Sequence, residues 1–341
     1  MMAAQIVEKG TVIIVDAEKP VAKPGHTVIR SLMVAICGSD LRKVYHLPES
    51  DYPLAPGVSG HEIVGVVEEI GAAGSEGNPD AIRVGDTVLG LIPVIENGMS
   101  EYYLTPSENV LPLPGSRNGL DRGALERLLM AQQLGTVIYA CRRIGPVTGK
   151  TAVVIGQGSA GLFFNVMLKR LGAARVITMD IVDARIEFAA RFGADHPFHP
   201  GREDPIEVVS SITGGAMADF VVEAVGEAES INLAARLVRT GGELLYFGVP
   251  HEPVFRFDFE ALYRAYCRTT STGSSGLEAG KPSFREALSL IASGEVDVSE
   301  MVTHRYPLDQ VGDAYRRAYD RSDGAIKVLV EMPDISRLNY R

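Results

Sequence analysis

Three residues near the start of the chain, Cys37, His61 and Glu62, have side chains that can bind a metal ion. A thiolate, an imidazole and a carboxylate are ligand types that zinc accepts, and three protein ligands with a water as the fourth are the arrangement of catalytic zinc. Zinc in such a site polarises an alcohol or carbonyl oxygen. The competing interpretation is a buried small cysteine, followed 24 positions later by an unrelated His–Glu pair. A second motif favours the zinc interpretation.

That second motif is a glycine-rich turn between a predicted strand and a predicted helix. The apolar run 151–155 is typical of a buried parallel strand, and residues 162–171 have helical spacing. The next predicted strand, 175–179, leads to Asp180, which lies where a carboxylate accepts hydrogen bonds from an adenosine ribose. The helix start offers free N–H groups to a pyrophosphate. We therefore predict a dinucleotide site, and not a purely structural turn, formed by Gly156, Gly158, Ser159, Ala160, Gly161 and Asp180.

Asp180 also indicates which dinucleotide binds. Its carboxylate would meet the 2′-phosphate of NADP as a like charge, whereas NAD carries no such phosphate. Arg185 is close enough in sequence to reduce this repulsion and is a further candidate contact to the cofactor. We expect the cofactor to be NAD.

Together these motifs resemble the zinc-dependent medium-chain alcohol dehydrogenases, and among them the polyol enzymes of the sorbitol and threonine dehydrogenase type. The resemblance covers nearly the whole chain. Besides the glycine-rich turn, it rests on these segments: Cys37-Gly38-Ser39-Asp40, Gly60-His61-Glu62 with Gly65, Val84-Gly85-Asp86-Thr87-Val88, Val222-Glu223-Ala224-Val225-Gly226, 241–248 and Gly324-Ala325-Ile326-Lys327-Val328. The segments at Cys37 and His61 are specific to zinc-binding members, and the others are shared with zinc-free relatives.

The order of the predicted elements indicates two domains. The first third of the chain is rich in short strands, expected at residues 26–36, 62–70 and 86–92. Beyond residue 135, helices and strands alternate, which indicates a parallel sheet covered on both faces. The resemblance implies an α/β protein in which a GroES-like β-barrel catalytic domain, residues 1–134, is resumed by residues 272–341. A Rossmann domain, a doubly wound parallel sheet, is then inserted as residues 135–271.

The resemblance also implies catalytic roles for Ser39 and Asp40. Ser39 would take the proton of the alcohol, although a serine at this position could instead cap a helix. Asp40 would orient the imidazole of a zinc ligand from behind, and the competing view is a solvated aspartate at a helix start. Tyr45, Leu47, Tyr52 and Leu91 are candidates for the substrate pocket.

Two residues depart from the family pattern. Gln132 stands where polyol dehydrogenases often have a glutamate close to the zinc, and an uncharged amide is a poor zinc ligand. Arg42 stands where many relatives have a proton-relaying histidine, and an arginine does not exchange protons at neutral pH. It could bind a phosphate of the cofactor or an anionic group of the substrate. Residues 90–126 contain no cysteine, so we expect one catalytic zinc and no structural zinc.

Composition narrows the possible partners and location. A formal net charge of −10 and the lack of Lys/Arg runs argue against nucleic-acid binding. No apolar stretch is long enough to span a membrane, and the first residues do not read as a secretory signal. Three cysteines argue against a disulfide framework, and Cys141 and Cys267 are expected to be packing residues. We expect a cytoplasmic protein, and the resemblance suggests a homodimer or homotetramer.

The leading hypothesis is a zinc-dependent, NAD-dependent dehydrogenase of a small secondary alcohol or polyol, or of the matching ketone. One alternative is a zinc-free quinone or enoyl reductase of the same fold, but such an enzyme needs neither Cys37 nor the His61–Glu62 pair. A second alternative is a dinucleotide-binding protein without turnover, which would have no use for Cys37, Ser39, His61 and Glu62 together. Fold alone does not distinguish the three, because function depends on the site.

Overall fold

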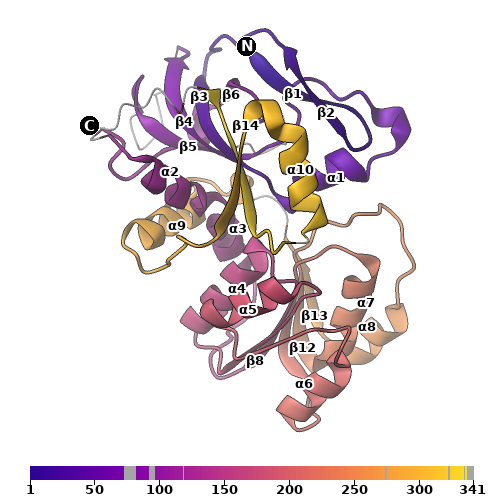
Figure 1. Cartoon of the computed structure of the whole chain (residues 1–341). Coiled ribbons are helices and arrows are strands. Elements are labelled where there is room, and N and C mark those ends of the chain that lie inside the picture. Colours follow the sequence, from indigo (N-terminus) through magenta and orange to yellow (C-terminus); the bar gives the residue numbers. More distant parts are fainter. Residues whose placement is uncertain are drawn as a thin grey trace. The chain divides into compact units, whose positions relative to one another are not determined.

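A computed structural model describes residues 1–72, 82–91, 97–117, 119–272, 275–321, 323–333 and 335. Asn78-Pro79-Asp80 and Asn118-Gly119 are typical turn sequences. The first lies outside the described residues and the second lies partly outside them, as does the end of the predicted strand at Ile92. The chain forms two compact units (Figure 1). The first unit contains Met1–Thr136, Ser274–Arg321 and Ala325–Arg341, and the second contains Val137–Gly273 and Ser322–Gly324.

The second unit is built on a six-stranded parallel sheet with the strand order β10-β9-β8-β11-β12-β13. This is the doubly wound order, in which the chain starts in the middle and reverses direction between β8 and β11. The strands are β8 (Thr151–Ile155), β9 (Arg175–Met179), β10 (His196–Phe198), β11 (Ala218–Glu223), β12 (Val238–Tyr246) and β13 (Arg268–Ser271). The helices are α4 (Ser159–Arg170), α5 (Asp183–Arg191), α6 (Pro205–Thr213), α7 (Ala228–Leu237) and α8 (Phe259–Ala265).

Helices cover both faces of this sheet. Figure 1 shows α4 and α5 on one side of the strands and α7 and α8 on the other. The central strands are apolar on both faces because each face is covered, and Val153, Ile177 and Val221 are fully buried. Because the strands are parallel, the carboxyl ends of β8, β9 and β11 lie at the same edge of the sheet. Ligands of doubly wound folds bind at this edge.

The first unit is built mainly from antiparallel strands. The long strand β3 pairs with β4, β6 and β15, and β15 pairs in turn with β14. The strands are β1 (Met2–Glu8), β2 (Thr11–Asp16), β3 (His26–Ala35), β4 (Glu62–Ile70), β5 (Thr87–Leu91), β6 (Tyr102–Pro106), β7 (Val110–Pro112), β14 (Val302–Pro307) and β15 (Lys327–Glu331). Four short 3₁₀ helices accompany them: η1 (Glu49–Asp51), η2 (Ser107–Asn109), η3 (Ser275–Leu277) and η4 (Leu308–Gln310).

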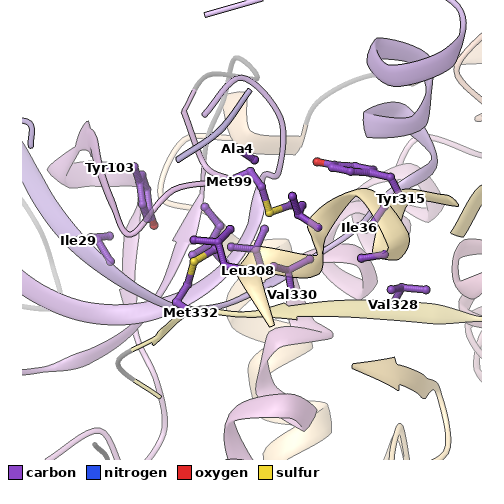
Figure 2. Packing of buried hydrophobic residues seen from close by; sticks show 14 of the residues in the cluster. Ala4, Ile29, Ile36, Met99, Tyr103, Leu308, Tyr315, Val328, Val330 and Met332 are labelled. Atoms are coloured by element: carbon purple, nitrogen blue, oxygen red, sulfur yellow. The ribbon is translucent and has the colours of Figure 1, made fainter. Parts of the chain in front are cut away.

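Segments from both ends of the sequence build the core of the first unit. Ala4 and Ile29 from the start of the chain pack in one cluster with Tyr315, Val328 and Met332 from its end (Figure 2). The longer helices here are α1 (Gly38–Tyr45), α2 (Arg122–Leu129), α9 (Pro282–Ala292) and α10 (Val311–Asp320), and α3 (Ala131–Cys141) crosses the boundary into the second unit. Strand β15 therefore lies directly beside the end of β3, and the N–H of Ile36 donates to the carbonyl of Val328.

The predicted fold class, an α/β protein with a GroES-like and a Rossmann part, is confirmed. Three predicted strands, β4, β8 and β9, have the predicted bounds. The helix predicted from residue 162 begins earlier, at Ser159, because Gly158 takes the N-cap position with an extended backbone. The apolar residues from 243 onward predict a strand, and the observed strand β12 begins earlier, at Val238, with the glycines at 241 and 242 inside it. Among the described residues, no helix is long and apolar enough to cross a membrane.

Candidate metal and cofactor sites

Cys37, His61 and Glu62 are brought together in the first unit. Strands β3 and β4 pair antiparallel with Ala35 opposite Glu62, so Cys37, two residues beyond Ala35, arrives next to the His–Glu pair. One potential ligand atom from each of the three residues lies within 4.8 Å of the other two. A thiolate, an imidazole nitrogen and a carboxylate oxygen at this separation can converge on one cation.

Asp40 joins the two segments that carry these residues. Its carboxylate accepts hydrogen bonds from the N–H of Cys37 at 2.9 Å and from the N–H of Gly60 at 2.8 Å. Its Oδ1 also lies 3.4 Å from Nδ1 of His61, without the geometry of a hydrogen bond. Asp40 is fully buried, so the alternative of a solvated aspartate at a helix start is wrong.

The charge of Asp40 controls the titration of His61. Burial by itself lowers the pKa of His61, but the adjacent Asp40 and then Cys37 raise it, and the net pKa is well above the usual range. Burial raises the pKa of Asp40, whereas His61 and the two backbone donors lower it, so the net pKa is below the usual range. Each member of the metal-free pair therefore favours the charged form of the other.

Ser39 lies one residue into helix α1 and is half-buried. The N-cap position is occupied by Cys37, so the alternative in which Ser39 caps the helix is wrong. Arg42 is on the same helix, and its Nε atom is buried with no hydrogen-bond partner among the described residues. Gln132 is nine-tenths buried in α3.

Tyr45 and Tyr52, two candidates for the substrate pocket, contact other residues of the first unit. The hydroxyl of Tyr52 donates to the carbonyl of Lys43 at 2.9 Å. The ring of Tyr45 stacks on Tyr319 with centroids 4.1 Å apart. Leu91 is fully buried at the end of β5, and Leu47 is half-buried.

The glycine-rich turn of the second unit has little room for side chains. Gly156 has a φ of +90°, and a Cβ there would lie 2.5 Å from the side chain of Val225. A Cβ on Gly161 would lie 1.9 Å from the carbonyl oxygen of Gly156, so helix α4 packs directly against the turn. Helix α4 starts at Ser159, and Gly158 provides no side-chain cap. A polyanion can approach the N–H groups of such a helix start.

Asp180 lies at the carboxyl end of β9, beside this turn. Its Oδ2 accepts the N–H of Gln157 at 2.6 Å, and its Oδ1 accepts the N–H of Val182 at 2.9 Å. Nη1 of Arg185 is 4.0 Å from Oδ2, and both side chains are at least nine-tenths buried. The turn, the acid and Arg185 therefore form one cluster, as the sequence predicts.

Comparison with known proteins indicates the family of the chain. Residues 23–133 match the alcohol dehydrogenase GroES-like domain, and residues 160–293 match the zinc-binding dehydrogenase family. The chain is 27% identical over 348 residues to a sorbitol dehydrogenase of Gallus gallus, with 92% of each protein covered. It is 27% identical over 347 residues to a D-arabitol-phosphate dehydrogenase of Enterococcus avium, with 93% of each covered. The solved alcohol dehydrogenase TADH from Thermus sp. ATN1 is similar with a TM-score of 0.79 and 27% identity, covering 97% of this chain and 100% of that one.

The chain belongs to the zinc-dependent medium-chain alcohol dehydrogenase family. It is therefore an enzyme, an oxidoreductase, and zinc and a nicotinamide dinucleotide are the cofactors of this family. The resemblance that the sequence motifs indicate is confirmed.

The donor set of the first unit fits the zinc of this family. As a zinc-bound thiolate and carboxylate, Cys37 and Glu62 would bring two negative charges, enough to neutralise Zn²⁺. Because Nδ1 of His61 is turned toward Asp40, the other ring nitrogen remains for a metal, and a carboxylate behind a metal-binding histidine is the usual support of such a ligand. In the described part of the chain, Cys37, His61 and Glu62 form the group of at least three potential ligands that could hold a metal ion.

Lys327 is a feature of this dehydrogenase that the sequence analysis missed. Its Nζ lies 2.8 and 3.0 Å from the two carboxylate oxygens of Glu62, and both side chains are buried. The lysine is in the tail segment that carries part of the family resemblance, but its partner is not visible in the sequence. Tyr315 was missed in the same way: its hydroxyl hydrogen-bonds to Ser59, which precedes Gly60 and His61.

Glu223 was also missed, at the edge of the second sheet. Its Oε1 accepts the N–H groups of Val225 and Gly226 at 2.8 and 2.9 Å and the hydroxyl of Ser230 at 2.8 Å. Burial raises the pKa of Glu223 despite these donors. The carboxyl group holds the turn whose Val225 packs against Gly156. This glutamate belongs to the segment 222–226, which carries part of the family resemblance, but nothing in that segment indicates that the side chain folds back on the turn.

Proposed function

We propose that this protein oxidises a secondary alcohol or polyol, or reduces the matching ketone, by transferring a hydride to or from NAD with one catalytic zinc. The observation that carries the proposal is the convergence of Cys37, His61 and Glu62 within 4.8 Å, with the buried Asp40 behind His61. Neither a zinc-free reductase nor a non-catalytic binding protein needs this combination of groups. The glycine-rich turn with Asp180 supports NAD as the hydride carrier.

Each residue of the first unit has a specific task in this proposal. Cys37, His61 and Glu62 hold the zinc, and Asp40 fixes the orientation of the His61 ring through the charge beside Nδ1. Bound zinc supplies Lewis-acid polarisation of the substrate oxygen. Ser39, two residues after Cys37, accepts the proton that leaves the alcohol hydroxyl as the hydride leaves its carbon. Arg42 does not relay this proton onward, because a guanidinium stays charged at neutral pH.

The second unit holds the cofactor in this proposal. The N–H groups at Gly158, Ser159, Ala160 and Gly161 face the pyrophosphate, and Gly156 allows the backbone to approach it. Asp180 accepts from the adenosine ribose, and Arg185 lies beside it. Residues 135–271 thus act as the cofactor domain, and residues 1–134 and 272–341 act as the catalytic domain. Bound NAD supplies the electrophilic carbon that receives the hydride.

Polyols and their phosphates are the substrates that the relatives favour. The similar proteins include a sorbitol dehydrogenase and a D-arabitol-phosphate dehydrogenase. Arg42 could bind an anionic substrate group, or instead a phosphate of the cofactor. Comparing Arg42→Gln with the wild type separates the two. A loss confined to phosphorylated substrates assigns Arg42 to the substrate, and a rise in the KM of NAD with every substrate assigns it to the cofactor.

The proposal is tested by assaying the purified protein with NAD and a set of polyols, sugars, amino-acid alcohols and anionic hydroxy compounds, following the absorbance of the reduced cofactor. Elemental analysis on the same sample measures zinc. NAD reduction that disappears with the zinc on chelation supports the proposal. Activity with quinones or enoyl compounds that survives chelation would favour the zinc-free reductase, and NAD binding without any turnover would favour the non-catalytic protein.

We also propose that the protein is a cytoplasmic homodimer or homotetramer. The second unit exposes three aromatic side chains, Phe259, Tyr263 and Tyr266, next to β13, the last strand of its sheet. Exposed apolar clusters and free sheet edges are typical association surfaces. Light scattering on the wild type and on Tyr263→Lys tests this proposal, and a monomeric wild type contradicts it.

A further inference from the structure

Two buried amide side chains lie beneath the glycine-rich turn and have no role in the proposed chemistry. Gln157 and Asn165 are both fully buried. Nδ2 of Asn165 donates to Oε1 of Gln157 at 2.7 Å. Nε2 of Gln157 donates in turn to the carbonyl oxygens of Gly156 at 3.0 Å and Val154 at 3.3 Å. The pair therefore connects helix α4 with the end of strand β8 from the inside of the domain.

The backbone of the turn explains why a buried amide is useful here. The carbonyl oxygen of Gly156 lies so close to Gly161 that a Cβ on that residue would be 1.9 Å from it. A carbonyl enclosed in this way needs a hydrogen-bond donor, since an unpaired buried polar group is costly. Gln157 supplies that donor, and Asn165 satisfies the oxygen of Gln157 and holds the amide in the required orientation.

Gln157 also determines where the acid lies. Its backbone N–H donates to Oδ2 of Asp180 at 2.6 Å, while its side chain points inward to Gly156 and Asn165. One residue thus joins the turn, the carboxyl end of β9 and helix α4. A shift of Gln157 would move the turn and Asp180 together.

We propose that Gln157, oriented by Asn165, is a positioning residue that preorganises the glycine-rich turn and Asp180 for the dinucleotide. This inference rests on the proposed cofactor site. A turn that already has its bound conformation loses less conformational freedom when the cofactor arrives, so the same contacts yield a tighter complex. Neither Gln157 nor Asn165 contacts the cofactor through its side chain. The two residues influence cofactor binding by fixing the backbone of the turn.

The test uses Gln157→Met, which keeps the length of the side chain and removes its donors, and Asn165→Leu, which keeps the size and removes the amide. The dissociation constant of NADH, measured by nicotinamide fluorescence, is expected to rise about 10-fold in Gln157→Met, the equivalent of one good hydrogen bond. The KM of NAD should rise in parallel, while kcat at saturating NAD changes less than about 2-fold. Asn165→Leu should weaken binding less, and the double variant should be no weaker than Gln157→Met, because the two residues act as one unit.

Asn232→Leu is the matched control. Asn232 is also an amide of the second unit with two hydrogen bonds to backbone, to the carbonyl of Arg256 and from the N–H of Asp258, but it lies on α7 away from the turn. It should lower the melting temperature without changing the dissociation constant of NADH. Asn165→Leu keeps the proposal testable if Gln157→Met does not fold.

The outcomes separate this inference from the proposed function. A wild type that binds no NADH contradicts the proposed function itself. A wild type that binds NADH, with both Gln157→Met and Asn165→Leu binding it equally well, overturns the positioning role. Variants that lose stability, kcat and affinity together, as a general structural defect would cause, overturn it too.

Discussion

Lys327 and Glu62 form an ion pair inside the first unit, with Nζ 2.8 and 3.0 Å from the two carboxylate oxygens. The residues are 265 positions apart in the sequence, and each exposes no more than 1% of its surface. Nζ also lies 3.5 Å from the carbonyl oxygen of Ile36, beside Cys37. If Glu62 binds zinc, the lysine and the metal ion are two cations that share one carboxylate.

Lys327→Met should therefore affect the metal-free and the zinc-loaded protein differently. Removing one partner of a buried ion pair costs roughly 3–5 kcal/mol because the other charge is left uncompensated. Zinc on Glu62 would provide compensation, so we expect a large fall in the melting temperature without zinc and a smaller one with it. Thermal unfolding with and without zinc measures the difference.

The control for this experiment is Lys281→Met. Lys281 is also a buried lysine of the first unit, but it donates to the carbonyl of Gly276 and faces no proposed zinc ligand. Its loss should lower both melting temperatures equally. An equal fall for Lys327→Met as well would mean that the Glu62 carboxylate does not bind zinc.

Zinc affinity should depend on pH through His61. Asp40 and Cys37 raise the pKa of His61 well above its usual range, so the metal-free ring keeps its proton to a higher pH than an ordinary histidine. Zinc needs the neutral ring and must displace this proton. Apparent affinity should rise by about 10-fold per pH unit per displaced proton until the pH exceeds the raised pKa. The imidazolium likewise stabilises the metal-free fold below the ordinary histidine pKa, and this contribution is lost as the pH rises through the raised value.

Competition titrations with a chelator across the neutral range test this dependence. Asp40→Asn removes the charge that raises the pKa of His61, so the pH range over which the zinc affinity rises should move to lower pH. The substitution also removes the carboxylate that orients the His61 ring. Identical pH profiles for the wild type and Asp40→Asn would show that Asp40 does not control the titration.

Ser39→Ala should lose turnover while keeping zinc and NAD. The hydroxyl is proposed to accept a proton and not to bind either cofactor, and such groups typically contribute about 10²–10⁴-fold to the rate. Ser50→Ala, at an exposed serine of η1, is the control and should be fully active. Near-normal turnover of Ser39→Ala, or loss of zinc along with activity, would show that the role is misassigned.

NAD should be preferred to NADP because Asp180 ends β9 beside the glycine-rich turn, where backbone N–H groups of Gln157 and Val182 fix both oxygens of its carboxylate. Asp180→Asn removes the like-charge contact with a 2′-phosphate, so the NAD-to-NADP ratio of kcat/KM should fall by at least about 10-fold. Asp183→Asn, which affects an exposed carboxylate paired with Arg202, should leave the ratio unchanged. A wild type with higher kcat/KM for NADP contradicts the prediction.

Gln132→Glu should slow the loss of zinc during dialysis against a chelator. A carboxylate near the metal would add support of the kind that typically changes metal affinity by about 10–100-fold. Gln133→Glu is the neighbouring control, since Gln133 is about as buried on the same helix but lies about 100° further around the helix axis. If wild type keeps its zinc indefinitely and Gln132→Glu changes nothing, then Gln132 does not lie near the metal.

The sequence by itself determined the local elements and the identity of the reactive groups. Strands β4, β8 and β9 could be predicted with their bounds, because the spacing of apolar residues within five to nine positions reflects which faces are buried. The turn at Gly156 and the acid at Asp180 could be predicted because strand, glycines and helix follow each other directly. Cys37, His61 and Glu62 could be named as candidate zinc ligands because their residue types suit the metal and the segments around them resemble those of zinc-binding relatives.

Only the tertiary structure decided which groups surround these residues. Burial of Asp40 excludes a solvated role, Cys37 takes the cap position that Ser39 was considered for, and Lys327 arrives from the far end of the chain to pair with Glu62. Gln157 stands between two glycines of the turn, and only its inward side chain and the contact with Asn165 reveal its hydrogen bonds. Such contacts depend on strand pairing across long separations and on which side of a turn a side chain occupies, and neither leaves a periodic pattern in a single sequence.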